Sequence, residues 1–374
     1  MNKTITLLSM LTRNILQNTD FKMKSVKYLP EYVVVQNSLA NSWDSFLEKH
    51  TEGNLVQCFN YGEILPIAYP RKKVARFSII HNGEPVGIVQ GTYTVYLGIG
   101  ITLAVELGPI VNAEMETKTK THVVEFLVQE LEAYCKKKRI IHLHFSIPDY
   151  LQIQEVFRKM NYTSAGKANE YVVNLKDGAQ KLWLEIHHNK RRNIKRALKD
   201  GVEITQSHKT EDLETFYSLY YATSKKRSFN AYPRSLFDEL WKNYNPELTK
   251  VFLANLNRQT VSGVFLAIQG KTVYALGAGS LAAGWAARPN DLMHWKAMEW
   301  ASENHYLKYD MGEVDEPPPT EGSSRWGIWR WKKEWKGNFE GFEKFDKIIL
   351  PRYKLLLDAR DFAYKRLRKL GVSI

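Results

Sequence analysis

The elements predicted along this chain occur twice in the same order, and that repetition restricts the folds open to it. In the first half, residues 75–91 alternate apolar and polar side chains around Asn82-Gly83, a dipeptide typical of a two-residue hairpin turn. A long amphipathic helix is predicted over 121–138, followed by a buried strand over 140–147. Strands and helices that alternate in this way are typical of an α/β fold.

The second half shows the same order of elements, although its residues differ from those of the first half. A hairpin is predicted over 250–270, a helix over 291–305 and a strand over 306–312. The chain has 374 residues, and single cores stop growing at roughly 250 to 300 residues. We therefore predict two related α/β domains, at 28–175 and 176–374, of which the second ends in a C-terminal helix.

Residues 1–27 are expected to form a flexible extension before the first domain. Their short apolar stretch is interrupted by Ser9 and Thr12 and is followed by no small-residue cleavage site, which is unlike a secretory signal. The alternative is that translation starts at Met23. Because no apolar run approaches the roughly 18 to 20 residues that span a bilayer, we expect a cytoplasmic protein.

The charge of the chain favours a polyanionic partner. It has 53 Lys+Arg against 40 Asp+Glu, a formal net charge of +13, which suits RNA, phosphorylated substrates or anionic lipid headgroups. Two cysteines, Cys58 and Cys135, lie far apart and lack the spacing of a disulfide framework or a zinc site. The ten histidines also show no ligand spacing, so no metal is expected.

The densest basic run is NKRRNIKRALK, within a stretch that predicts one helix over 181–201 ending at Gly201. Helical spacing puts its basic side chains on two adjoining faces. These side chains are Arg191, Lys195 and Lys199 on one face and Arg192 with Arg196 on the other. Such a surface either contacts phosphates of RNA or of a pyrophosphate precursor, or is simply solvated, and both interpretations remain open.

A second unusual stretch, RWGIWRWKKEWKGNFEGF over 325–342, holds four of the ten tryptophans among arginines and lysines. We interpret it as the edge of a pocket with a nucleic acid as a local guest, and contact with a membrane surface is the alternative. Trp331 suits stacking on a terminal adenine, which contributes about 1 to 3 kcal/mol. The alternation of Trp329 and Trp331 with cationic residues equally predicts a half-buried strand.

Several stretches occur in a familiar order between residues 43 and 347. They are Gln57 with Tyr61, GEPVG, Gly108-Pro109, RRNIKRALKDGVEI, TSKKRSF, VSGVFLAIQG, ARPNDLMHWKAMEW, YDMG and RWGIWRWKKEWKGNFE. In this order the chain resembles the FemAB family of non-ribosomal aminoacyltransferases. The resemblance implies two tandem GNAT-like (acyl-CoA N-acyltransferase) domains, with mixed sheets flanked by helices.

The resemblance also implies a reaction and residues for it. The second domain would hold the end of an aminoacyl-tRNA, and the cleft between the domains an acceptor amine on a peptidoglycan precursor. Lys332 would orient the ester carbonyl, Arg227 would contact precursor phosphate, and Gln57 and Tyr61 would contact substrate. Where cell-wall members carry a phosphate-gripping lysine, this chain has Tyr61-Gly62-Glu63-Ile64-Leu65, and Lys72 and Lys73 are the nearest replacements.

The chemistry of acyl transfer suggests further candidates. Transfer to an amine needs an oriented carbonyl, a stabilised oxyanion and a route for a proton. A lysine among aromatic residues, such as Lys332, suits the oxyanion. Asp310 ends a predicted strand, where α/β folds place ligand contacts, and Tyr274 is predicted to line the same pocket. Turn capping by Asp310 and core packing by Tyr274 are the alternatives.

Two other functions remain open at this stage. An acyl-CoA-dependent N-acyltransferase would use the same fold, but neither Gly98-Ile99-Gly100 nor Gly277-Ala278-Gly279 has the spacing of a pyrophosphate-binding loop. The non-enzyme alternative is an RNA-binding protein that has lost the acceptor cleft. A monomer is expected, because the repeat forms its cleft within one chain.

Overall fold

The computed structural model describes residues 23–26, 29–36, 40–96, 98–207, 209–227, 229–244, 246–315, 317–355 and 358. The strands are β1 (Met23–Val26), β2 (Leu29–Gln36), β3 (Lys72–His81), β4 (Glu84–Tyr96), β5 (Ile99–Val105), β6 (Ile110–Val111), β7 (Ile140–Pro148), β8 (Thr163–Asn174), β9 (Glu203–Ser207), β10 (Thr249–Leu256), β11 (Gln259–Gln269), β12 (Thr272–Ser280), β13 (Lys308–Val314) and β14 (Asn338–Ile348). The helices are α2 (Ala40–His50), α3 (Phe59–Ala68), α4 (Thr117–Lys138), α5 (Gln154–Lys159), α6 (Gly178–Glu185), α7 (His188–Lys199), α8 (Thr210–Arg227), α9 (Arg234–Glu239), α10 (Pro289–Glu303) and α11 (Ser324–Lys333).

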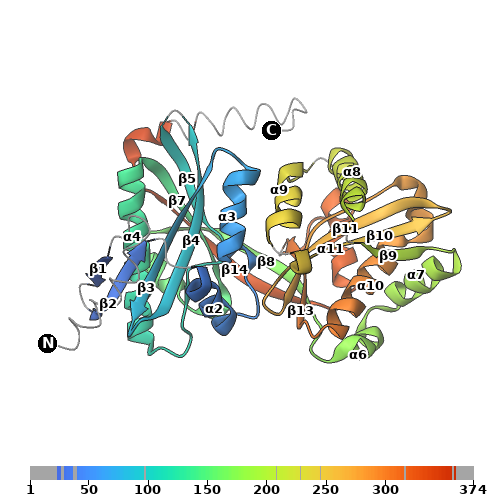
Figure 1. Ribbon diagram of the computed structural model, residues 1–374, viewed down its shortest axis with the longest axis horizontal. Helices are drawn as coiled ribbons and strands as arrows, with labels where there is room; N and C mark the ends of the chain where they lie inside the picture. The colour runs from blue at the N-terminus through green and yellow to red at the C-terminus, as the bar shows by residue number, and fades with distance from the viewer. Residues whose placement is uncertain are drawn as a thin grey trace.

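The described strands join into one mixed sheet that runs through both halves of the chain (Figure 1). Its order is β1-β2-β3-β4-β5-β7-β14-β8-β13-β12-β11-β10-β9, and β6 is attached to β4. The β5–β7 and β12–β13 pairs are parallel, and the other pairs are antiparallel. The last strand, β14, lies between β7 and β8, so the C-terminal part of the chain returns to the sheet of the first half.

Both predicted hairpins form, for a local reason. Asn82 and Gly83 have φ values of 53° and 87°, and Asn257 and Arg258 have φ values of 51° and 65°. Two consecutive residues with positive φ are what a type I′ turn requires, and this turn matches the twist of the paired strands. The turns therefore fix the registers of β3 with β4 and of β10 with β11.

Two hydrophobic cores lie on opposite faces of the second-half strands. In β10, Val251 and Leu253 pack into one core, while Phe252 and Ala254 pack into the other. This is the period of two expected for a strand buried on both faces. The first core joins α8 and α9 to the helices of the first half, and the second contains α6, α7 and α10. The division near residue 175 stays a proposal, since one core is shared between the halves.

Three sequence predictions need correction or limits. Part of the predicted flexible extension, Met23–Val26, forms β1, because it pairs with the free edge of β2. Residues 1–22 and the predicted C-terminal helix lie outside the described residues, apart from the first residues of that helix. The half-buried strand predicted around Trp331 is wrong, because Ser324–Lys333 forms α11 with Ser323 accepting a hydrogen bond from the Trp326 amide.

The predicted single helix over 181–201 is two helices. The helix is interrupted at Ile186 and His187. There the His187 side chain accepts a hydrogen bond from the Asn189 amide and caps the N-terminus of α7. Gly201 follows α7 with a φ of 79°, as predicted for the residue after a helix end.

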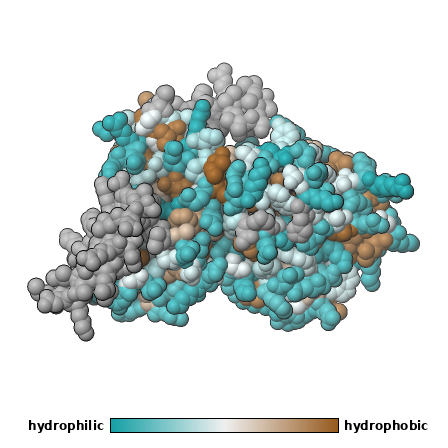
Figure 2. All heavy atoms as spheres, in the orientation of Figure 1, coloured by the Kyte–Doolittle hydropathy of each residue, from teal (hydrophilic) through white to brown (hydrophobic). Residues whose placement is uncertain are grey.

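No helix within the described residues is both long and apolar enough to cross a membrane. On the face shown in Figure 2, hydrophilic side chains predominate and apolar ones are scattered among them.

Candidate active site

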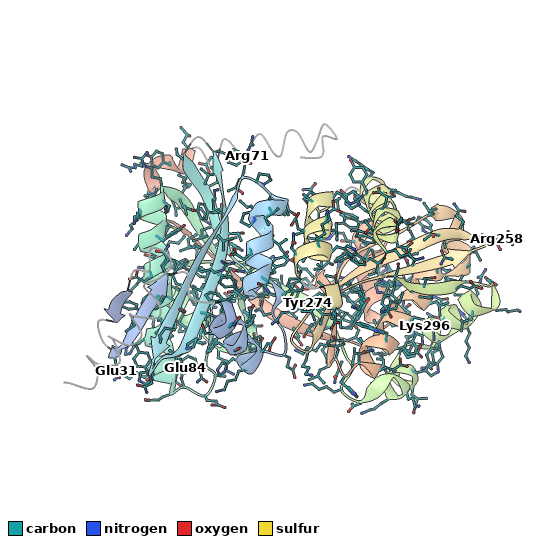
Figure 3. The ribbon with its side chains drawn as sticks, viewed as in Figure 1. Glu31, Arg71, Glu84, Arg258, Tyr274 and Lys296 are labelled. Atoms are coloured by element: carbon teal, nitrogen blue, oxygen red, sulfur yellow. The ribbon has the colours of Figure 1, made fainter. Side chains whose placement is uncertain are left out.

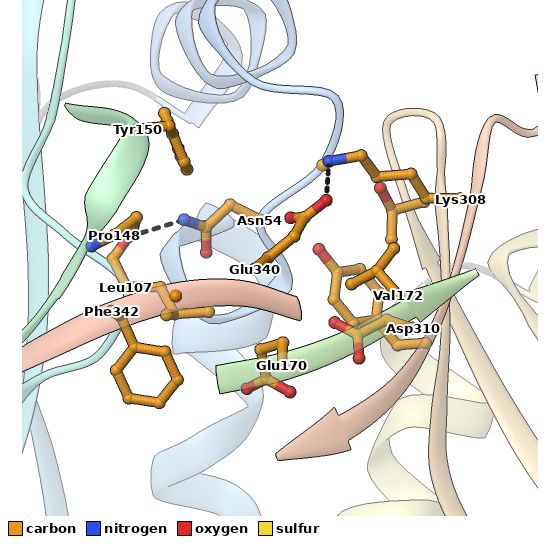
Figure 4. Close-up of a pocket in the computed structure, with 14 residues that line it drawn as sticks. Asn54, Leu107, Pro148, Tyr150, Glu170, Val172, Lys308, Asp310, Glu340 and Phe342 are labelled. Carbon is orange, nitrogen blue, oxygen red and sulfur yellow. Dashed lines mark hydrogen bonds and ion pairs between the residues drawn. The ribbon is translucent and has the colours of Figure 1, made fainter. Parts of the chain in front are cut away.

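A pocket lies where strands from the two halves meet, and it is the candidate active site. Tyr274 stands at this junction (Figure 3). The lining side chains come from both halves and from the central strands (Figure 4). They belong to Gly53, Asn54, Leu107, Pro148, Tyr150, Glu170, Val172, Thr272, Tyr274, Lys308, Asp310, Glu340, Gly341 and Phe342.

One wall of the pocket is made by a loop of the first half that docks on the β11–β12 turn. The Asn54 amide donates to Gln269 Oε1 over 2.6 Å, and the Lys271 amide donates to the Glu52 carbonyl over 2.7 Å. Gly53 lies between them, and a Cβ there would stand 2.4 Å from the Gln269 carbonyl oxygen. Only glycine therefore permits this close approach of the two halves.

A second link across the junction is ionic. Lys308 Nζ lies 2.6 Å from Glu340 Oε1 and 3.0 Å from Glu52 Oε2. Lys176 Nζ lies 2.6 Å from the other Glu52 oxygen. Burial lowers the pKa of Lys308, but its hydrogen bonds with Glu340 and Glu52 outweigh this, and the net pKa is raised. Lys308 is thus held as a cation at the mouth of the pocket.

Lys332 lies beside the pocket on α11. Its Nζ donates to the carbonyls of Gly312 and Glu313 over 3.0 and 3.1 Å, and the residue is 8% exposed. Burial lowers the pKa of Lys332, while Glu170 and Asp310 oppose that shift. The net pKa of this predicted catalytic lysine is lowered, and its Nζ is held by two backbone carbonyls.

Asp310 and Glu170 are the two carboxylates whose charges most strongly raise the pKa of Lys332. Asp310 accepts a hydrogen bond from the Gly312 amide over 2.7 Å and is 8% exposed. Burial raises the pKa of Asp310. Burial also raises the pKa of Glu170, and the Asp310 charge raises it further. Asp310 thus combines both interpretations, since it closes the β13 turn and also lines the pocket.

Trp331 holds α11 in place. Its indole Nε1 donates to Asp291 Oδ1 over 2.7 Å, and its ring lies edge-on to His294, with centroids 5.0 Å apart. The fully buried Lys190 lies 4.6 Å from the Trp331 ring centroid and donates to the same Asp291 oxygen over 2.8 Å. Stacking of Trp331 on adenine stays a prediction, and the described contacts give the ring a packing role.

Of the five basic residues of α7 predicted to contact phosphate, one is engaged by backbone carbonyls and four are exposed. Arg191 Nη1 donates to the carbonyls of Trp183, Leu184 and Ile186, so it caps the end of α6. Arg196 reaches Asp200 over 3.3 Å. Arg192, Lys195, Arg196 and Lys199 are all exposed.

Two predicted substrate contacts in the first half are buried. Gln57 is 0% exposed, and its amide bonds the backbone of Gln90 and the Glu106 carbonyl. Its proposed contact with substrate conflicts with this burial, because every polar atom of the side chain has a backbone partner. Tyr61 is 9% exposed, and burial raises its pKa.

The predicted phosphate contacts have mixed placements. Glu63, in the stretch Tyr61-Gly62-Glu63-Ile64-Leu65, pairs with the buried Arg76. Lys72 is half-buried with its Nζ 4.6 Å from the Tyr69 ring centroid, and Lys73 is exposed. Arg227 is exposed at the end of α8, 5.7 Å from the Trp285 ring centroid, and does not line the pocket.

Sequence reasoning missed Glu170, Lys308 and Glu340. Glu170 lies in the predicted strand NEYVVNL. The only sequence feature that distinguishes it is its charge, directly before a run of apolar residues. Within the described residues, no group of three or more His, Cys, Asp or Glu side chains is placed to hold a metal ion.

Comparisons with known proteins agree with this architecture. A family model described as an acetyltransferase (GNAT) domain matches residues 186–333. A curated relative, the UDP-N-acetylmuramoylpentapeptide-lysine N(6)-alanyltransferase of Weissella viridescens, is 21% identical over 136 residues, 36% of this chain. The match spans 40% of that relative's length.

Solved structures match over most of the chain. The crystal structure of FemX has a TM-score of 0.72 at 17% identity and covers 86% of this chain and 99% of its own. The structure of L-PGS from Bacillus licheniformis has a TM-score of 0.53 at 14% identity, covering 88% and 96% of the two chains. The mixed α/β GNAT fold predicted from the sequence is thereby confirmed.

Proposed function

We propose that this FemAB-like chain transfers an amino acid from aminoacyl-tRNA to an amine acceptor. The observation that carries the proposal is the buried ammonium of Lys332, held by two backbone carbonyls beside the carboxylates of Asp310 and Glu170. A cation fixed in advance next to a pocket suits a reaction in which negative charge develops on a carbonyl oxygen.

In this proposal each group has a separate task. The ester carbonyl of the donor points at Lys332, whose remaining N–H stabilises the oxyanion that forms when the amine attacks. Asp310 keeps Lys332 charged and, through the Gly312 amide, keeps the β13 turn closed around it. Tyr274, between Asp310 and the first-half wall, orients the substrates in the pocket.

The acceptor that we propose is a primary amine on a peptidoglycan-type peptide. The curated relative carries such an acceptor in its name, a lysine of UDP-N-acetylmuramoylpentapeptide. Glu63 is an anion paired with Arg76, so it cannot bind phosphate as the family's lysine does. We assign phosphate contacts to Lys72 and Arg227 instead, and place the reaction in the cytoplasm, where charged tRNA is found.

The test is a transfer assay with competing donors. The purified chain is given lysine-containing UDP-N-acetylmuramoylpentapeptide and either radiolabelled alanyl-tRNA, a charged total-tRNA pool or labelled acetyl-CoA. We expect label to move to the peptide only from tRNA. Transfer from acetyl-CoA alone would reassign the chain as an N-acyltransferase, and RNA binding without any transfer would favour the RNA-binding alternative.

The exposed side chains of α7 give a separate prediction about tRNA. Replacing Arg192, Lys195 and Lys199 together by alanine should weaken tRNA binding and make it less sensitive to salt. Each lost phosphate contact lowers the slope of log K against log salt by about 0.7 to 0.9. Filter binding at several salt concentrations measures this slope, and Lys296→Ala on α10 is the control. An unchanged slope would mean that this face is only solvated.

A further inference from the structure

Glu170 occupies an unusual electrostatic position at the centre of the sheet. In register it faces Glu340 on β14 and Glu313 on β13, so three glutamates stand in a row across three strands. Like charges directly opposite one another destabilise a sheet. A row of this kind therefore needs compensating cations.

The two outer glutamates have such partners. Lys308 Nζ lies 2.6 Å from Glu340, and Lys344 Nζ lies 3.3 Å from Glu313. No described hydrogen bond or ion pair reaches Glu170, and its Oε2 atom is buried without a partner. An unsatisfied buried oxygen is rare in folded proteins and calls for an explanation.

The geometry of the pocket explains why the Glu170 oxygen has no partner within the protein. Glu170 lines the pocket, and Figure 4 shows its carboxylate close to that of Asp310, whereas Glu340 turns to Lys308. Lys332 is the basic group that lowers the pKa of Glu170. Its Nζ, however, donates its hydrogen bonds to the Gly312 and Glu313 carbonyls. Glu170 thus presents a carboxylate oxygen that has no hydrogen-bond partner among the described residues, with Lys332 as a nearby charge that does not bond it.

We infer that Glu170 binds the ammonium group of the acceptor and takes its proton before transfer. This inference rests on the proposed function. An alkyl ammonium brings a positive charge and several N–H donors, which match an unpaired carboxylate beside Asp310. The protonated amine is not a nucleophile, so some group in the pocket must remove a proton, and Glu170 is placed to do so.

The proton balance is complete with groups already named. The ammonium gives one proton to the Glu170 carboxylate, and the amine nitrogen then bonds the ester carbonyl carbon. As the bond between that carbon and the ribose oxygen breaks, a second proton passes from nitrogen to the ribose oxygen, which leaves as a hydroxyl. Glu170 returns to its carboxylate by releasing the first proton to water.

Several charged or titratable groups set the proton affinity of Glu170. They are Asp310 and Glu313 on β13, Glu340 on β14, Tyr274 on β12, Tyr232 before α9 and Lys332 on α11. Burial, first, and the acidic neighbours, second, raise its pKa, and Lys332 opposes them. A carboxylate with a raised pKa is a stronger base near neutral pH than an ordinary one.

The first experiment measures binding and needs no turnover. Calorimetry compares lysine-containing UDP-N-acetylmuramoylpentapeptide with its Nε-acetylated form, for the wild type, Glu170→Gln and the control Glu155→Gln, which alters an exposed glutamate on α5. We expect the wild type and the control to prefer the free amine at least tenfold, and Glu170→Gln to lose this preference. A preference that persists in Glu170→Gln, or is absent from the wild type, overturns the ammonium site.

The second experiment tests the proton transfer with alanyl-tRNA as donor. At pH 7 the kcat/KM of Glu170→Gln should fall by about 10² or more. The loss should stay level up to about pH 8, where Glu170 itself becomes ionised in the wild type, and should shrink about tenfold for each pH unit above that, because more acceptor is already deprotonated. A loss that is equal at every pH indicates a structural defect and overturns the base assignment. If the wild type binds the amine but transfers nothing, the proposed function fails and the ammonium site stands.

Discussion

Replacing Lys332 by alanine should lower kcat for aminoacyl transfer by about 10² to 10³, the range seen when a single oxyanion donor is removed. The effect should appear mainly in kcat, because Lys332 acts on charge that develops during the reaction rather than on the bound substrates. Single-turnover transfer from alanyl-tRNA measures it directly.

Lys333 is the matched control for this experiment. It is the next residue on α11 and is exposed, and its Nζ lies 5.5 and 4.5 Å from the ring centroids of Trp329 and Phe339. Lys333→Ala should keep transfer within about threefold of the wild type, by analogy with other surface substitutions. Equal losses in the two variants, or a loss confined to KM, would remove Lys332 from the oxyanion role.

A folding effect must be separated from the catalytic one. Without Lys332, Asp310 and Glu170 lose the cation that opposes their raised pKa values. Each carboxyl with a pKa raised in the folded state lowers stability as the pH rises from its unfolded value toward its folded value. Lys332→Ala should therefore lose stability relative to the wild type as the pH rises above the folded-state pKa values of Asp310 and Glu170, about 6 and about 8. Denaturant unfolding from near-neutral to mildly basic pH would show it.

Local signals explain how much of the fold could be predicted. Asn82-Gly83 marks its turn through its own backbone preferences, so the hairpin was predictable from a few residues. The position of β14 was not, because its partners β7 and β8 lie more than 150 residues earlier in the chain. A strand of this length carries no local information about which strands it will join.

The site shows the same division. Lys332 and Asp310 could be proposed from the sequence, because Asp310 ends a predicted strand and Lys332 lies in the tryptophan-rich stretch 325–342. Gln57 was misjudged because burial depends on Gln90 and Glu106, which reach it only in the folded sheet. Glu170 was missed for the complementary reason: a carboxylate within a strand becomes notable only when its neighbours in register, Glu340 and Glu313, are known.

The largest expected effect on stability comes from Lys190, which also packs against α11, the helix that carries Lys332. Its side chain is fully buried, lies 2.8 Å from Asp291 Oδ1 and 3.5 Å from Glu334 Oε2, and shares the Asp291 oxygen with Trp331. Burial lowers the pKa of Lys190, and Asp291 opposes that shift. Removing this cation leaves two acidic side chains without their buried partner.

Lys190→Ala should therefore lower the free energy of unfolding by about 3 to 5 kcal/mol, the cost of breaking one side of a buried ion pair. Lys195→Ala, an exposed change on the same helix, should cost less than about 0.5 kcal/mol. Denaturant unfolding of both variants gives the comparison, and a cost below about 1 kcal/mol for Lys190→Ala would contradict it.

Adding Asp291→Ala to Lys190→Ala should cost less than the sum of the two single changes, since each already breaks the same ion pair. Because Asp291 also holds the Trp331 indole next to Lys332, the stability loss should be accompanied by slower transfer if Lys332 has the proposed role, which would tie the buried pair to the position of that lysine.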